Sequence, residues 1–185
     1  MNTALVKDFM IQIGKFPRIS DTATLSGAVM ALDRAQEEFS SGKREQRILL
    51  VTDGANKVVG KLSPIDVIRG LEPNYDKLVD EQASAFVGNH DYIIQSMKNQ
   101  TTLWSHPLDD LCTTAKDVCI RDFIQPLNPS QVIDQEETLN NAFHRFVMFK
   151  HDSLFVMDEH RLVGMLRFSD VYREIVRRIK EICRI

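Results

Sequence analysis

The sequence predicts an α/β fold in which one β-α-β-β-α unit occurs twice, with a helical insertion between the two copies. Three observations predict it: segments recur in the same order, each copy has apolar residues at helical spacing, and each copy then has two short apolar runs around a turn. We divide the chain into a first unit at residues 1–73, an insertion at 74–114 and a second unit at 115–185. Because so small a unit is marginal alone, the copies are expected to pack face to face as a pseudo-twofold pair.

The repeat is visible in two separated matches that share one register. Residues 7–10 (Lys-Asp-Phe-Met) recur as residues 121–124 (Arg-Asp-Phe-Ile), and the Thr-Leu-x-x-Ala string at 24–28 recurs at 138–142. The offset between the copies is smaller in their later parts. We interpret the polar stretch at residues 37–45 as an insertion in the first copy that explains this change.

The first helix of each copy is predicted from a single apolar stripe. Apolar residues recur at intervals of three and four over Leu25–Ala35 and over Leu139–Phe149, as on the buried face of a helix. The stripes consist of Leu25, Ala28, Val29 and Leu32 in the first copy and of Leu139, Ala142, Phe143 and Phe146 in the second.

A strand, a turn and a second strand are predicted to follow each helix. Short apolar runs occupy residues 48–51 and 58–62 in the first copy, and residues 153–157 and 162–166 in the second. The residues between the runs are turn formers, such as the sequence Asp-Gly-Ala-Asn at 53–56. A closing helix is expected from Ser63-Pro64 in the first copy and near Ser169-Asp170 in the second, since proline suits a first helical turn.

Two further segments are predicted to be helical. The insertion at 74–114 has helical spacing of apolar residues, and it either covers the module or meets a protein partner. The last helix, over residues 171–182, has basic residues opposite a face made of Ile175, Val176, Ile179 and Ile182. We interpret it as a packed helix with a solvated outer face, although a basic amphipathic helix can also bind a membrane or nucleic acid.

The stretch from Leu49 to Ile68 resembles the CBS-domain family. It consists of Leu-Leu-Val-Thr-Asp, a short turn, and Val-Val-Gly-Lys-Leu-Ser-Pro-Ile-Asp-Val-Ile. The resemblance extends over both copies and leaves out only the insertion. It implies a tandem pair, or Bateman module, whose clefts bind AMP, ATP or another adenosyl compound, and which assembles as a homodimer.

In the first copy the resemblance implies that Ser63 and Asp66 contact ribose hydroxyls. A carboxylate can accept two hydrogen bonds from a vicinal diol, and a helix N-terminus beside it offers N–H groups to a phosphate. The same spacing also fits a capping box, in which both side chains only complete the first helical turn. Residues that match the family's adenine-holding first strand are Lys15, Phe16, Pro17 and Ile19, and core packing explains Ile19 equally well.

The second copy departs from this pattern, since Arg167 and Phe168 stand where Ser63 and Pro64 stand, while Asp170 is retained. The Arg167 guanidinium could bind a phosphate, or it could pair with Asp170 and fill the cleft. Further phosphate-binding candidates stand before the strands and can equally be solvated surface residues: Lys43, Arg44, Arg47, Lys150 and His151.

Other classes of function are disfavoured. The net charge of −3 gives no general attraction to nucleic acid or anionic membranes, and no phosphate-binding glycine loop or metal-ligand spacing is present. Three unpaired cysteines and no signal pattern favour a cytoplasmic location. We therefore expect a non-catalytic, regulatory module that senses an adenine nucleotide and holds no resident cofactor; the alternative is a structural interaction module, bound to an unidentified protein partner, whose clefts are empty or self-filled.

Overall fold

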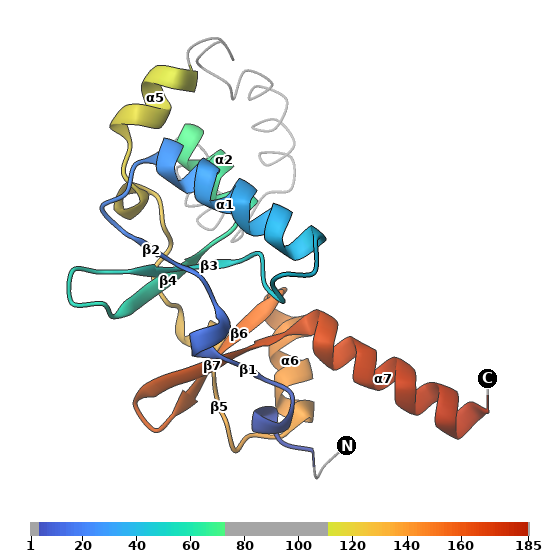
Figure 1. The fold of residues 1–185 in the computed structure, drawn as a ribbon. Coiled ribbons are helices and arrows are strands. Elements are labelled where there is room, and N and C mark those ends of the chain that lie inside the picture. Colours follow the sequence, from blue (N-terminus) through green and yellow to red (C-terminus); the bar gives the residue numbers. More distant parts are fainter. Residues whose placement is uncertain (1–3, 73–110, 185) are drawn as a thin grey trace, which may run out of the picture. The chain divides into compact units, whose positions relative to one another are not determined.

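The computed structural model describes residues 4–72 and 111–184, which form two compact units (Figure 1). One unit contains residues 17–72 with 111–125, and the other contains residues 4–16 with 126–184. Each unit has its own sheet, its own helices and its own apolar core. Residues 74–110 of the predicted helical insertion lie outside the described residues.

The unit built on the first copy has a three-stranded sheet in the order β2-β3-β4. Strand β2 pairs in parallel with β3, and β3 pairs antiparallel with β4. The elements in chain order are β2 (Arg18–Ser20), α1 (Leu25–Ser40), β3 (Leu49–Thr52), β4 (Val58–Leu62), α2 (Pro64–Leu71) and α5 (Leu111–Asp117), followed by a 3₁₀ turn at Ile120–Asp122.

The unit built on the second copy has the same order of elements and one additional strand. Its sheet runs β1-β7-β6-β5, in which β5 is parallel to β6 and the other neighbours are antiparallel. The elements are β1 (Ile11–Gln12), β5 (Val132–Asp134), α6 (Leu139–Phe149), β6 (Ser153–Asp158), β7 (Arg161–Arg167) and α7 (Phe168–Cys183), with 3₁₀ turns at Val6–Asp8, Ile13–Lys15 and Pro129–Gln131. The predicted β-α-β-β-α order is therefore confirmed in both copies.

The cores contain most of the predicted helical stripes. Helix α1 buries Leu25, Ala28 and Leu32 as predicted, and it adds Ala35. Val29 is 42% exposed, so its assignment to the buried stripe is wrong. In α6 the buried residues are Leu139, Ala142 and Phe146, and Phe143 packs against the same core while partly exposed.

Each copy is completed by a segment from elsewhere in the chain, which we call its leading segment. It is residues 111–125 for the first copy and residues 4–16 for the second. Val6 is fully buried in the core of the second copy, and its backbone N–H donates to the Glu137 carbonyl at 2.9 Å. Ile120 is fully buried in the core of the first copy, and its N–H donates to the Ala23 carbonyl at 2.9 Å. The compact units thus differ from the sequential division at residues 73 and 115, because segments preceding each copy in sequence complete the other copy's core.

Two helices are longer than the sequence indicated. Helix α1 continues to Ser40 because side chains one turn apart stabilise its last turns, with Arg34 contacting Glu38 at 3.2 Å. Helix α7 begins at Phe168 and ends at Cys183. Its residues Ile179 and Ile182 are exposed, so their assignment to the packed face of the helix is wrong.

Candidate functional site

Three segments meet at one end of the sheet in the first copy. Strand β2 begins after Pro17, β3 begins shortly after Arg47, and β4 ends just before Ser63. The register pairs Leu49 with Leu62, and the Pro17 carbonyl accepts a hydrogen bond from the Leu50 N–H at 2.9 Å. Since β2 and β3 are parallel and β4 is antiparallel to β3, the sequence-predicted residues of these three segments gather at one end of the sheet.

The N-terminus of α2 at this end is closed by a cap. The Asp66 carboxylate, only 6% exposed as a residue, accepts hydrogen bonds at Oδ2 from the Ser63 N–H at 2.8 Å and from the Ser63 hydroxyl at 2.6 Å. Its other oxygen, Oδ1, contacts the Arg69 guanidinium at 3.3 Å. Pro64 occupies the first helical position. The capping interpretation of Ser63 and Asp66 is therefore confirmed, and the cap fixes the orientation of the carboxylate.

The equivalent end of the second sheet brings together Ser130, His151 and Arg167. These residues precede β5, precede β6 and end β7, respectively. The Ser130 hydroxyl and His151 Nε2 lie 2.9 Å apart, and the His151 ring stacks on Phe149 with ring centroids 5.9 Å apart. The sequence alone placed His151 here but did not single out Ser130, which has no recognisable local motif.

At the N-terminus of α7 the guanidinium of Arg167 donates two hydrogen bonds to the Asp170 carboxylate. Arg167 Nε donates to Oδ2 at 2.6 Å, and another guanidinium nitrogen donates to Oδ1 at 2.7 Å. Both side chains are mostly shielded, with exposed fractions of 21% and 14%. Of the two interpretations left open for Arg167, the structure shows the ion pair with Asp170.

The predicted adenine-holding segment is divided between the two compact units. Lys15 is exposed and Phe16 is buried in the unit that contains residues 4–16. Pro17 and Ile19 belong to the other unit, where Ile19 is half-buried against the core.

The cations before β3 already have partners or face solvent. Arg44 Nε donates to Glu38 at 2.6 Å, and this hydrogen bond lowers the pKa of the Glu38 carboxyl. Arg47 is exposed and makes a long contact of 3.5 Å with Gln36, while Lys43 is exposed. Arg47 is thus the candidate at this end of the sheet that would lose only a weak contact if it bound a ligand.

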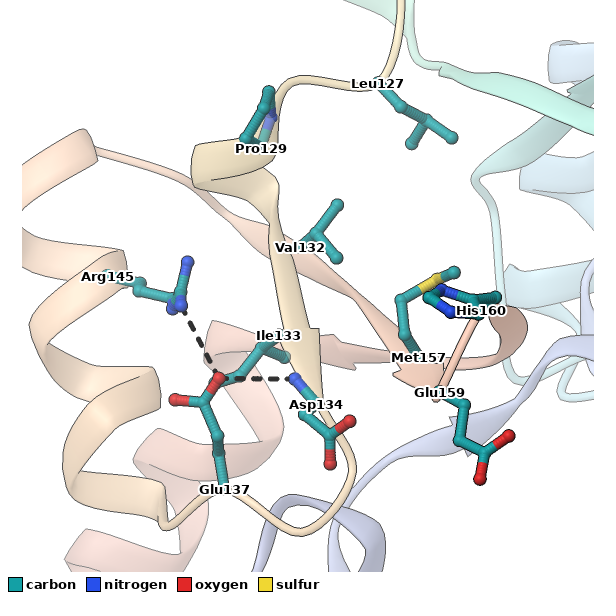
Figure 2. Close-up of a pocket in the computed structure, with 10 residues that line it drawn as sticks. All are labelled: Leu127, Pro129, Val132, Ile133, Asp134, Glu137, Arg145, Met157, Glu159 and His160. Carbon is teal, nitrogen blue, oxygen red and sulfur yellow. Dashed lines mark hydrogen bonds and ion pairs between the residues drawn. The ribbon is translucent and has the colours of Figure 1, made fainter.

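An open pocket of about 540 Å³ lies elsewhere in the second copy, along strand β5 (Figure 2). Arg145 and Glu137 form an ion pair at 3.5 Å on one side of β5, while Met157 and His160 lie on the other. Glu137 also accepts a long hydrogen bond of 3.4 Å from the Asp134 N–H, which protects the free edge of β5. None of the site residues predicted from the sequence lines this pocket.

Within residues 4–72 and 111–184, no three His, Cys, Asp or Glu side chains are grouped to hold a metal ion. Among the helices described there, none is long and apolar enough to cross a membrane.

Comparison with known proteins identifies the fold. Residues 115–177 match the family model described as CBS domain. The solved structure of CBSX2 in complex with AMP is 19% identical, has a TM-score of 0.53, and covers 94% of this chain and 97% of its own; CBSX2 from Arabidopsis thaliana is described as a CBS-pair protein.

Two structures without a described function are equally similar. An uncharacterized conserved protein from Pyrococcus horikoshii is 14% identical, with a TM-score of 0.56 and coverage of 95% of this chain and 94% of its own. A hypothetical conserved protein from Geobacillus kaustophilus is 13% identical, with a TM-score of 0.57 and coverage of 94% and 97%. Identity at this level shows a shared fold, and no curated protein matches the chain.

Proposed function

We propose that this chain, which has the fold of a CBS-domain pair and a CBS domain at residues 115–177, is a regulatory module that binds an adenine nucleotide. One similar structure was solved in complex with AMP, which supports the choice of ligand. Binding would alter the conformation of the module or its affinity for a partner. A ligand achieves this only by binding one conformation more tightly than another.

The observation that carries the proposal is the orientation of the Asp66 carboxylate. Its Oδ2 atom is fixed by the two hydrogen bonds from Ser63, while Oδ1 has only a long contact with Arg69 at 3.3 Å. Each carboxylate oxygen can accept more than one hydrogen bond. Oδ1 is therefore held in one direction by the cap and has capacity to accept a ribose hydroxyl.

The surrounding sheet end suits the rest of a nucleotide. In the first turn of α2, Pro64 has no N–H and the Asp66 N–H is bonded to the Ser63 carbonyl, so the Ile65 N–H is the one assigned to an anion. Arg47 is exposed just before β3. Pro17 and Ile19 supply apolar surface on β2. We assign the phosphate to the helix N-terminus and Arg47, and the base to the β2 side.

The proposal is tested by calorimetric titration of the full chain with AMP, ATP and S-adenosylmethionine. Asp66→Asn should weaken binding at least about tenfold, because it removes a charged acceptor. The matched control is Asp33→Asn, which neutralises an exposed carboxylate on α1 and should leave the affinity unchanged. If none of the three compounds binds below about millimolar, the sensor function is wrong; if Asp66→Asn binds normally, the assigned site is wrong.

A second candidate function is an interaction module with a self-filled cleft, and the ion pair between Arg167 and Asp170 favours it for the second copy. This function predicts no nucleotide binding by the wild-type chain. Neither the nucleotide sensor nor the interaction module is proposed to catalyse a reaction. Incubation with ATP followed by product analysis should show no ADP or AMP, and turnover would contradict this.

A further inference from the structure

The two copies treat the acidic residue at the start of their last helix differently. In the first copy, Asp66 holds Ser63 through Oδ2 and leaves Oδ1 with a 3.3 Å contact. In the second copy, both oxygens of Asp170 receive short hydrogen bonds from Arg167, at 2.6 and 2.7 Å. At Asp170 a guanidinium thus occupies the edge of the carboxylate that a diol would bind in the same two-point way, whereas at Asp66 the Oδ1 atom has only a long contact.

The Arg167 contact is of the strong kind. A guanidinium that donates two parallel hydrogen bonds to a carboxylate combines charge with a fixed planar geometry. A ribose diol offers two neutral donors, which form weaker hydrogen bonds to the same oxygens. To bind Asp170, a nucleoside would have to displace the guanidinium. The hydrogen bonds that the nucleoside forms with the carboxylate would be weaker than those that the guanidinium loses.

The packing around Arg167 keeps its backbone in place. The next residue, Phe168, packs edge-to-face on Phe146 with ring centroids 5.5 Å apart and stacks with Tyr172 at 6.1 Å. Its backbone N–H donates to the Asp152 carbonyl at 2.9 Å. Because Arg167 is fixed between the end of β7 and this aromatic cluster, its side chain starts next to Asp170 in a constant geometry.

We propose that Arg167 closes the second copy to nucleosides by occupying Asp170, so that each chain binds one adenine nucleotide, at Asp66 of the first copy. This inference rests on the proposed function for its ligand. Arg167 acts here as a specificity-determining residue: it is the intramolecular occupant of the position that a ribose would take in the second copy.

The test is the stoichiometry of AMP and ATP binding to the full chain, measured by calorimetry. The wild type should bind one nucleotide per chain. Arg167→Ser, which restores the residue of the first copy, should bind a second nucleotide, and Asp170→Asn in that background should remove it again. The matched control is Arg173→Ser on the same helix, whose side chain is 77% exposed and contacts Asp170 at 3.7 Å; it should stay at one.

The possible outcomes distinguish a failure of this inference from a failure of the proposed nucleotide-binding function. Two AMP molecules per wild-type chain, or no gained site in a folded Arg167→Ser variant, would overturn the closure while leaving nucleotide sensing intact. Two ATP molecules in the wild type, reduced to one by Arg167→Ser, would show that the guanidinium binds phosphate and would also overturn it. A wild type that binds neither nucleotide would overturn the proposed function. If Arg167→Ser then bound one nucleotide, the result would still show that Arg167 closes the second copy. If Arg167→Ser also bound none, that role of Arg167 would be refuted as well.

Discussion

Gly164 in β7 lies so close to Met10 that a Cβ atom added to the glycine would be 2.8 Å from the methionine sulfur. The same Cβ would lie 2.7 Å from the Ile11 carbonyl oxygen, on the strand β1 that pairs with β7. Gly60 has the corresponding role in the first copy, where a Cβ would be 3.0 Å from the Gln125 carbonyl oxygen. The glycine of each Val-Gly pair in β4 and β7 therefore admits the leading segment that completes that copy.

Gly164→Ala should destabilise the protein by about 1–3 kcal/mol, because the methyl group forces a backbone carbonyl and a packed side chain to move. Gly54→Ala is the matched control, since a Cβ at that exposed glycine meets nothing within 4 Å. Urea denaturation measures the free energy of unfolding of both variants. Equal stability of Gly164→Ala and Gly54→Ala would contradict the close approach.

The leading segment should be required for the stability of the second copy. Val6 is fully buried beside Leu139 and Leu166, and three backbone hydrogen bonds join this segment to the second copy: Val6 to Glu137, Lys7 to Gln135 and Leu139 to Ala4. Val6→Ala should cost about 2 kcal/mol from two buried methyl groups and the resulting cavity.

The control for this prediction is Lys7→Ala, which leaves the backbone hydrogen bonds in place and removes only an ion pair between exposed side chains, Lys7 and Glu136. It should change the free energy of unfolding by less than about 1 kcal/mol. Urea denaturation followed by circular dichroism compares the two variants. If Val6→Ala were as stable as Lys7→Ala, the segment would not belong to this core.

Local order could be predicted from the sequence, but the exchange of leading segments could not. The helices that begin at Leu25 and Leu139 follow from the spacing of their apolar residues. Strand β4 (Val58–Leu62) coincides with the apolar run that ends just before Ser63. In contrast, the short 3₁₀ turn at Val6–Asp8 carries no periodic pattern. Its place in the second core depends on contacts more than 120 residues away in sequence, such as that between Val6 and Glu137.

The sequence identified the candidate residues of the proposed site but not the contacts that they make. The motif identified Ser63 and Asp66, and the structure shows the cap that orients the carboxylate. For Arg167 the sequence left two partners open, because a guanidinium can bind either a phosphate or a carboxylate. Only the geometry at Asp170, with two short hydrogen bonds, distinguishes them in this structure.

Glu174 should make the stability of α7 depend on pH in the acidic range. Hydrogen bonds from Arg177 and then Arg178 lower the pKa of this carboxyl from 4.5 to about 2. Because the folded-state pKa is lower than the unfolded one, the stabilisation is fully present above about pH 4.5 and is lost as the pH falls toward 2.

Glu174→Gln should therefore lower the unfolding midpoint at pH 7 and make a much smaller difference near pH 2, where about half of the folded-state carboxyl is protonated. Glu181→Gln is the control, since its side chain is 60% exposed and pairs with Arg177 at the end of the network. Thermal unfolding of the three proteins between pH 2 and 7 measures the difference. A deficit in Glu174→Gln that persisted unchanged at pH 2 would show a packing effect instead of a charge effect.

The end of α6 and helix α7 expose large apolar side chains that should form a homodimer contact. Together with the partly buried Ile175, those on α7 follow the alternating four- and three-residue spacing of paired helices. Seven side chains are between 40% and 80% exposed: Val147, Met148, Phe149, Phe168, Tyr172, Ile179 and Ile182. At on the order of 100 Å² each they expose roughly 700 Å², close to the ~800 Å² per partner of a standard interface.

Two copies of the chain should therefore associate through this face around a twofold axis, since one self-complementary surface then serves both partners. Ile179→Glu combined with Ile182→Glu should raise the dimer dissociation constant at least about a hundredfold, because two carboxylates would be buried without partners. Lys180→Glu, a charge change beside them on the same helix, should leave association unchanged. Sedimentation equilibrium distinguishes the outcomes. A wild type that stays monomeric at high concentration, or a double variant that still dimerises, would contradict the prediction that this face forms the dimer.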